Sequence, residues 1–223
     1  MKDYRFLFKK YVLRKYPAYE PQVRRELSRI RGDLFVDIGA NVGIYTVRLA
    51  SHFRSVYAFE PNPNVLPELR WRIRRSRRNN IVVFPMALAN ANGKAEFYLD
   101  AQRTFSMPTD ILLRLFRFEP GRDQNAGLTK THHGRKKITV PTAAYDSQVP
   151  ESADLVKIDV EGAEFLVLEG AKKALESGRI RRLMIELHDL ERQGELEDLL
   201  TGYGFNLRKL DPNSSRIIAY ARN

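Results

Sequence analysis

Cysteine is absent from this chain of 223 residues. Its absence excludes disulfides, thiolate zinc sites and a cysteine nucleophile. The chain also lacks an apolar run of the ~20 residues that a membrane-spanning helix needs. No small-residue cleavage site follows a hydrophobic stretch near its beginning. We therefore expect a cytoplasmic protein without transmembrane segments.

The length and the 43% of hydrophobic residues suit one sizeable core better than two domains. Short apolar segments alternate with segments of helical periodicity, which is typical of a doubly wound, mostly parallel, Rossmann-like α/β sheet. We expect the last two strands to form an antiparallel hairpin. The predicted strands are 34–38, 55–60, 81–88, 94–99, 136–141, 154–158, 181–187, 205–210 and 216–221, and the predicted helices of this sheet are 43–53, 64–78, 161–177 and 191–202.

A loop with two glycines, VDIGANVG, follows the first predicted strand and leads into a helix. After Asp37 its spacing is Gly39-x-x-x-Gly43, so it lacks the Gly-x-Gly-x-x-Gly pattern of a dinucleotide site. The loop, which includes Asn41, suits S-adenosylmethionine instead. The methionine part of that cofactor can lie against glycine backbone while Asp37 faces its cationic portion. An ordinary tight turn between strand and helix is the alternative for the two glycines.

A glutamate ends the second predicted strand, in the segment YAFEPNPN. Glu60 lies 23 residues after Asp37, close to the interval at which an acidic side chain accepts both ribose hydroxyls of a nucleotide. We add Asn62, in the same segment, and Ala87, near the end of strand 81–88, as candidate cofactor contacts. A solvated strand end is the alternative for Glu60, but the order and spacing of the two segments favour a cofactor site.

These two segments, with LVKIDVEGAEFLVLEGA (155–171) and MIELH (184–188), resemble the FkbM-type branch of the class I S-adenosylmethionine-dependent methyltransferases. KIDVEGAE is the branch-specific part. The resemblance runs from about Asp33 to about Asp211 and is weak between about 100 and 137. It departs mildly at Ala144-Tyr145-Asp146, where the family usually has Thr-Leu-Asp. It implies a class I fold, S-adenosylmethionine and usually O-methylation, and it leaves the acceptor open.

Four ionisable residues lie where two predicted strands end. Lys157 and Asp159 share one side of the chain, as do Glu186 and His188. In the strand order that the resemblance implies, the two strands are neighbours, so the four side chains would meet at the edge where open α/β sheets bind ligands. We expect His188 or Asp159 to act as general base and Glu186 to orient it or contact the acceptor. A buried Lys157 needs a charge partner, and it could also stabilise an alkoxide.

These residues also have other possible roles. Asp159 could cap a helix that starts near Glu161, and Glu161 could complement the dipole of that helix. Asp159, Glu161, Glu186 and His188 together form a chemically possible metal site. We expect no metal, because the carboxylates have cationic or capping partners and methyl transfer from a sulfonium does not require one.

The net charge of +11 is concentrated in two segments, since residues 1–31 carry +7 and residues 68–78 carry +5. Such segments favour contact with an anionic partner, either RNA through residues 1–31 and 70–78 or, with less support, a membrane surface. Residues 2–16 have the pattern of a basic amphipathic helix, and a second short helix is expected at 22–30. The first helix could dock on the core, on the second subunit of a homodimer or on a membrane.

We therefore divide the chain into a basic N-terminal helical extension, 1–31, and a methyltransferase domain, 32–223. Residues 100–135 interrupt the alternation of strands and helices and are predicted to form an acceptor lid. The favoured function is O-methylation of a hydroxyl on a small-molecule or glycosidic acceptor. Methylation of an RNA ribose 2′-OH is the first alternative. A non-catalytic module that binds the cofactor and docks on a partner is the second.

Overall fold

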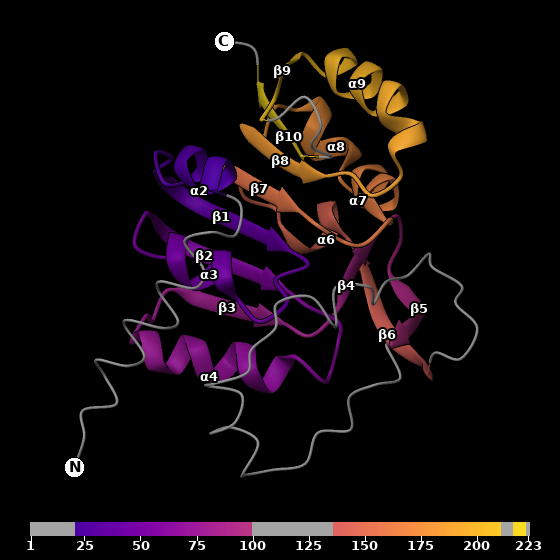
Figure 1. Ribbon diagram of the computed structural model, residues 1–223. Helices are drawn as coiled ribbons and strands as arrows, with labels where there is room; N and C mark the ends of the chain where they lie inside the picture. The colour runs from indigo at the N-terminus through magenta and orange to yellow at the C-terminus, as the bar shows by residue number, and fades with distance from the viewer. Residues whose placement is uncertain (1–20, 100–135, 211–215, 222–223) are drawn as a thin grey trace, which may run out of the picture.

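The computed structural model describes residues 21–99, 136–210 and 216–221. The predicted helix 2–16 and the predicted lid 100–135 lie outside the described residues. A seven-stranded sheet with the order β3-β2-β1-β7-β8-β10-β9 forms the centre of the fold (Figure 1). Its strands are β1 (Gly32–Ile38), β2 (Phe53–Phe59), β3 (Ile81–Phe84), β7 (Leu155–Ile158), β8 (Arg182–Glu186), β9 (Phe205–Lys209) and β10 (Arg216–Ala221).

The sheet is parallel except where β10, the last strand of the chain, joins it. Strands β3, β2, β1, β7 and β8 pair in parallel, and β10 pairs antiparallel with both β8 and β9. The predicted doubly wound sheet and its closing antiparallel hairpin are therefore confirmed. Strands β7 and β8 are neighbours, as the expected convergence of their ends requires.

Helices cover both faces of the central sheet. The helical segments are α2 (Pro21–Leu27), α3 (Ile44–Leu49), α4 (Leu66–Ser76), α6 (Tyr145–Gln148), α7 (Glu164–Gly170), α8 (Lys172–Glu176), η1 (Leu190–Arg192) and α9 (Gln193–Gly202). Side chains of α2 and α3 share one buried cluster with Phe35 of β1, whereas side chains of α7, α8 and α9 share another with Leu34 and Val36. Successive residues of β1 thus face opposite layers, which makes this strand the centre of a three-layer fold.

The predicted strand 81–88 is wrong in one respect, because the structure divides it between two sheets. Strand β3 ends at Phe84, and Ala87 begins β4 (Ala87–Ala89), which joins β5 (Gly93–Leu99) and β6 (Lys136–Ala144) in a separate sheet of order β4-β6-β5. Pro85 explains the division, since proline has no N–H to continue a ladder.

Two predicted helices are also shorter than expected. The predicted helix 43–53 ends at Leu49, and Phe53 is instead the first residue of β2. The predicted helix 161–177 begins only at Glu164, because Glu161 and Gly162 have φ of 55° and 102°, outside the right-handed helical region. It then divides into α7 and α8 at Ala171. Among the described residues, no helix is both long and apolar enough to cross a membrane.

Candidate active site

The loop between β1 and α3 packs directly against the end of β7. Gly39 and Gly43 have φ of 76° and 82°, a region that favours glycine. A Cβ at Gly39 would lie 1.8 Å from the carbonyl oxygen of Asp159, and one at Gly43 would lie 2.4 Å from the side chain of Leu69. At Gly39 the backbone of Asp159 leaves no room for a side chain, whereas at Gly43 the left-handed backbone is the stronger reason for glycine. Gly39 thereby brings the predicted cofactor loop into contact with the predicted catalytic edge.

Glu60 ties this loop to the end of β2. Its Oε2 accepts a hydrogen bond from the backbone N–H of Asn41, and its Oε1 accepts one from the backbone N–H of Asn62, both at 2.7 Å. Each carboxylate oxygen keeps a second lone pair for another donor. Burial raises the pKa of Glu60 to about 7, although the two hydrogen bonds act in the opposite direction. The structure thus joins three of the predicted cofactor residues around one buried carboxylate.

Lys157 lies between two carboxylates. Its Nζ is 3.0 Å from Oδ2 of Asp159 and 3.6 Å from Oδ1 of Asp37, which faces it across the β1–β7 pair. Thr46 of α3 donates a hydrogen bond of 2.6 Å to Oδ2 of Asp37. Burial alone would lower the pKa of Lys157, but the charges of Asp159 and Asp37 outweigh it and raise that pKa. Lys157 is therefore a cation at neutral pH, and its predicted need for a charge partner is met.

His188 is held by a buried glutamate. Its Nδ1 lies 2.8 Å from Oε1 of Glu164, which also accepts a hydrogen bond from the backbone N–H of Gly162. Because a carboxylate accepts at Nδ1, the neutral imidazole carries its proton there and leaves Nε2 bare. Nε2 lies 3.5 Å from Oε2 of Glu161 and 4.0 Å from Oδ1 of Asp159. Burial lowers the pKa of His188, but the hydrogen bond to Glu164 and the nearby carboxylates outweigh it and raise that pKa.

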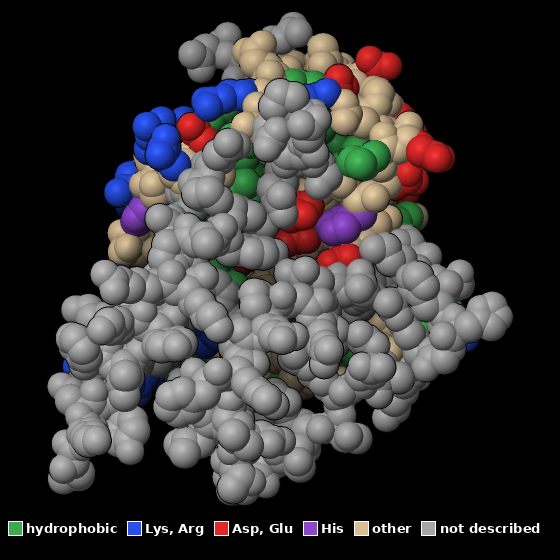
Figure 2. All heavy atoms as spheres, viewed as in Figure 1, with side chains coloured by type: hydrophobic (Ala, Val, Ile, Leu, Met, Phe, Trp, Pro, Cys, Tyr) green, Lys and Arg blue, Asp and Glu red, His purple; other side chains and the backbone are tan. Residues whose placement is uncertain are grey.

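The structure therefore brings Lys157, Asp159 and His188 together. Glu186 belongs to the same electrostatic environment, since its charge contributes to the raised pKa of Lys157. On the face shown in Figure 2, acidic side chains lie beside a histidine near the middle of the molecule. The capping alternative for Asp159 does not hold, because α7 begins at Glu164 with Ala163 as its N-cap residue.

Sequence reasoning missed Glu164 and Thr46. Glu164 lies on the buried face of α7 with Val167 and Leu168, at the i+3 and i+4 spacing. An acidic residue within an apolar helical stripe was the available signal. Ala87 is the candidate cofactor residue that the structure sets apart, because it lies in the small sheet in an apolar cluster with Phe97 and Val140. Its role in cofactor binding stays a prediction.

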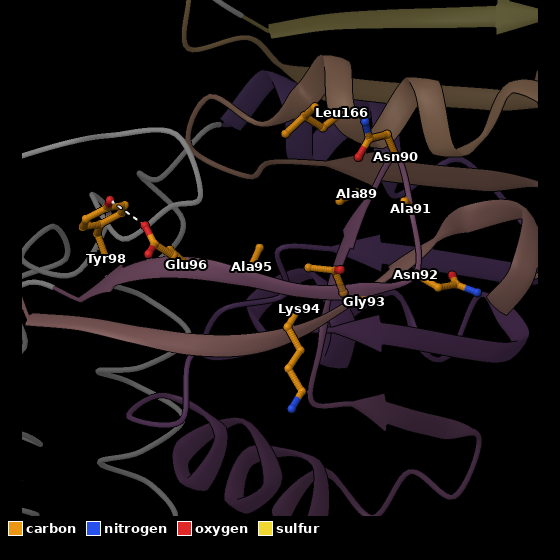
Figure 3. A pocket seen from close by; sticks show the side chains of 11 residues that line it. Ala89, Asn90, Ala91, Asn92, Gly93, Lys94, Ala95, Glu96, Tyr98 and Leu166 are labelled. Carbon is orange, nitrogen blue, oxygen red and sulfur yellow. Dashed lines mark hydrogen bonds between the residues drawn. The ribbon is translucent and has the colours of Figure 1, made fainter.

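A pocket of about 430 Å³ lies beside the small sheet (Figure 3). Its lining comes from the end of β4, the following turn, β5, β6 and α7, and none of the predicted site residues contributes to it. The pocket is therefore distinct from the cluster around His188.

Comparison with known proteins places the chain among methyltransferases. Residues 37–207 match the Methyltransferase FkbM domain family. The 31-O-demethyl-FK506 methyltransferase FkbM of Streptomyces tacrolimicus is 30% identical over 79% of this chain and 74% of its own length. The hexuronic acid methyltransferase AglP of Haloferax volcanii is 25% identical over 70% of this chain and 56% of its own length.

A solved structure shares the fold. The methyltransferase FkbM of Methylobacillus flagellatus superimposes with a TM-score of 0.58 at 18% identity, covering 85% of this chain. The present chain spans only 44% of that protein's length. The likeness concerns the fold alone.

Proposed function

We propose, starting from the fact that this chain belongs to the FkbM methyltransferase family, that it transfers the methyl group of S-adenosylmethionine to a hydroxyl of a small-molecule or glycosidic acceptor. The name of one relative concerns a 31-O-demethyl compound, which supports methylation at oxygen, and that of the other concerns a hexuronic acid, which supports a sugar acceptor. Methylation at oxygen and the acceptor class are the parts that extend beyond family membership.

The residues around Glu60 fit S-adenosylmethionine. A buried carboxylate at the end of a strand, with one lone pair left on each oxygen, can accept the two ribose hydroxyls. The left-handed backbone of Gly39, Asn41 and Gly43 keeps the loop close to this carboxylate. When bound, the cofactor supplies a methyl group that is already activated as a sulfonium.

One observation supports the assignment of both halves of the site. Gly39 of the cofactor loop touches the backbone of Asp159, whose side chain contacts Lys157 and lies near His188. A cofactor held by the loop would therefore lie beside the ionisable cluster. Positioning of this kind is the main requirement for an in-line methyl transfer.

The chain's own residues then have distinct roles. Glu164 holds the imidazole of His188 so that bare Nε2 faces the cluster, where it can take the proton of an acceptor hydroxyl. Lys157 restrains Asp159 and offsets its charge and that of Asp37. Asp159 is the second candidate for the base. Glu186 is assigned to acceptor contact.

The described part of the basic surface does not favour an RNA acceptor. Helix α4 carries the arginines from Arg70 to Arg75, and Arg77 and Arg78 follow its end at Ser76. The helix runs from the end of β2 back toward the start of β3 (Figure 1). Its last arginines therefore lie toward the amino ends of the strands, whereas the cluster around His188 lies at their carboxyl ends. Arg72 is paired with Glu68 at 2.7 Å, and the Arg75 guanidinium lies 5.7 Å from the centroid of the Trp71 ring.

Methyl-labelled S-adenosylmethionine tests the proposal when the full chain is incubated with fractionated cell extract. We expect label in small molecules or glycans, as a base-stable methyl ether, and stoichiometric S-adenosylhomocysteine. Label in RNA that disappears when Arg74, Arg75, Arg77 and Arg78 are neutralised would favour the RNA alternative, for which binding must also weaken with salt. Cofactor binding without any turnover would instead favour a non-catalytic module.

A further inference from the structure

We propose that Asp159, Glu161 and His188 bind a divalent metal cation. One ligand atom from each residue lies within 4.8 Å of the others, and all three side chains are half-buried and so accessible from solvent. Asp159 and Glu161 come from the segment between β7 and α7, and His188 follows β8. The inference goes beyond the proposed function and rests on it for the role of the cation. It differs in one assignment, because Nε2 of His188 binds the cation here and is then not the base.

Asp159 and His188 each have one side-chain atom that contacts a neighbouring protein side chain and a second atom that faces the proposed cation site. Oδ2 of Asp159 is engaged by Lys157 at 3.0 Å, whereas Oδ1 faces Nε2 of His188. In the same way, Nδ1 of His188 is engaged by Glu164 at 2.8 Å, whereas Nε2 faces Glu161. An imidazole that ligates a metal commonly donates a hydrogen bond from its second ring nitrogen to a carboxylate, which orients the ring.

The distances fit a cation better than direct hydrogen bonds. Nε2 of His188 is 3.5 Å from Oε2 of Glu161 and 4.0 Å from Oδ1 of Asp159, which is too long for a strong hydrogen bond. Two ligands that are each about 2.1 Å from one ion lie roughly 3.0 Å apart at right angles and about 4.2 Å apart when opposite. In the neutral imidazole, Nε2 and the two carboxylates thus face one another across a gap of the size that an ion fills, and a cation there would compete with the proton that the carboxylates favour on His188.

The charge of the surroundings also favours a cation. Asp37 and Asp159 lie beside Lys157, and Asp159, Glu161 and the buried Glu164 lie around His188. The expectation of a metal-free site assumed that the carboxylates had cationic or capping partners. The capping part does not hold, because α7 begins at Glu164, three residues after Glu161. The cationic part holds for Asp159, whose Oδ2 contacts Lys157.

Two carboxylates and one imidazole suit a cation such as Mn²⁺ or Mg²⁺. Three protein ligands leave positions open, which one or two hydroxyls of a polyhydroxylated acceptor can occupy. A bound hydroxyl becomes more acidic. Its proton passes to solvent, its oxygen forms the new bond to the methyl carbon, and the carbon–sulfur bond of the sulfonium breaks to give the thioether.

Titration calorimetry of the full chain with Mn²⁺ tests the site without requiring turnover. We expect one Mn²⁺ per chain, displaced by excess Mg²⁺. Glu161→Gln and His188→Gln should each weaken binding at least tenfold. Glu169→Gln, a matched loss of charge at an exposed position of α7, should leave it unchanged. Circular dichroism and the affinity for S-adenosylmethionine establish that each variant is folded.

The outcomes separate the two proposals. Absence of Mn²⁺ binding by the wild type, or equal weakening by Glu169→Gln, would overturn the cation site. Methyl transfer that persists after dialysis against a chelator would also overturn its role and leave the proposed function with His188 as base. Site-specific Mn²⁺ binding without methyl transfer to any acceptor would leave the cation site and overturn the proposed function.

Discussion

Lys157 and Asp37 face each other across β7 and β1, with Nζ 3.6 Å from Oδ1 and both side chains almost wholly buried. Burial raises the pKa of Asp37, and the charge of Lys157 together with the hydrogen bond from Thr46 opposes that rise. A pair of this kind adds little net stability compared with apolar residues, but each charge depends strongly on the other. The pair with Asp37 holds Lys157 in a position where its Nζ also contacts Asp159.

Removing one partner should therefore destabilise the fold. We predict that Lys157→Met lowers the free energy of unfolding by about 3–5 kcal/mol, because Asp37 would remain buried without its cation. Urea denaturation measures the change. Adding Asp37→Asn to that variant should recover a large part of the loss. Arg54→Met, which breaks an exposed pair with Asp33, is the control and should leave the midpoint unchanged. An equal loss of unfolding free energy in Lys157→Met and Arg54→Met would contradict a buried pair.

Cofactor affinity should depend on Glu60. Truncation in Glu60→Ala removes the acceptor of the Asn41 and Asn62 N–H groups and, on our proposal, of two ribose hydroxyls. We expect S-adenosylmethionine to bind at least about tenfold more weakly, which corresponds to about 1.4 kcal/mol. Calorimetry on a folded variant provides the test. Unchanged affinity would remove Glu60 from the cofactor site.

The affinity should also vary with pH near neutrality. The pKa of Glu60 is raised to about 7 by burial, and the ionised carboxylate is the better acceptor of two hydroxyls. Affinity should therefore be highest above pH 7 and fall as the pH drops below 7, approaching about tenfold per pH unit if only the ionised form binds. Comparison with Glu60→Gln separates this effect from titration of the cofactor's amino group. Parallel profiles for the two proteins would refute the assignment.

Gly39 should not tolerate a side chain. Alanine there would place Cβ 1.8 Å from the backbone oxygen of Asp159, at a φ of 76°. We predict that Gly39→Ala lowers the free energy of unfolding by at least about 2 kcal/mol, from overpacking of ~1–3 kcal/mol and left-handed strain of ~1–3 kcal/mol. Gly202→Ala, where no neighbouring atom lies within 4 Å of the added Cβ, is the matched control and should be near neutral. Thermal unfolding of both variants decides the matter.

The sequence was sufficient for the main sheet because its pattern is local. Apolar strands such as Phe35–Ile38 alternate with helical segments, and the neighbouring positions of β7 and β8 followed from the family resemblance. The meeting of Lys157, Asp159 and His188 could be anticipated for the same reason.

The remaining features depend on contacts between distant segments. The division of strand 81–88 at Pro85 was visible in the sequence, but the pairing of Ala87 with β6 was not. The support of His188 by Glu164 depends on the turn at Glu161 and Gly162, whose positive φ moves the start of α7. Likewise, no local pattern indicates that Glu60 accepts the N–H of Asn41, 19 residues earlier.

The most direct test of the account is the rate of methyl transfer by His188→Ala in the extract fraction that the wild type labels. We predict that the variant binds S-adenosylmethionine with unchanged affinity, because His188 lies on the acceptor side of the site. Its rate of label transfer should fall by about 10²–10⁴-fold, the usual contribution of a positioned base. Transfer at the wild-type rate by a folded His188→Ala protein would contradict the assignment of this edge of the sheet as the catalytic site.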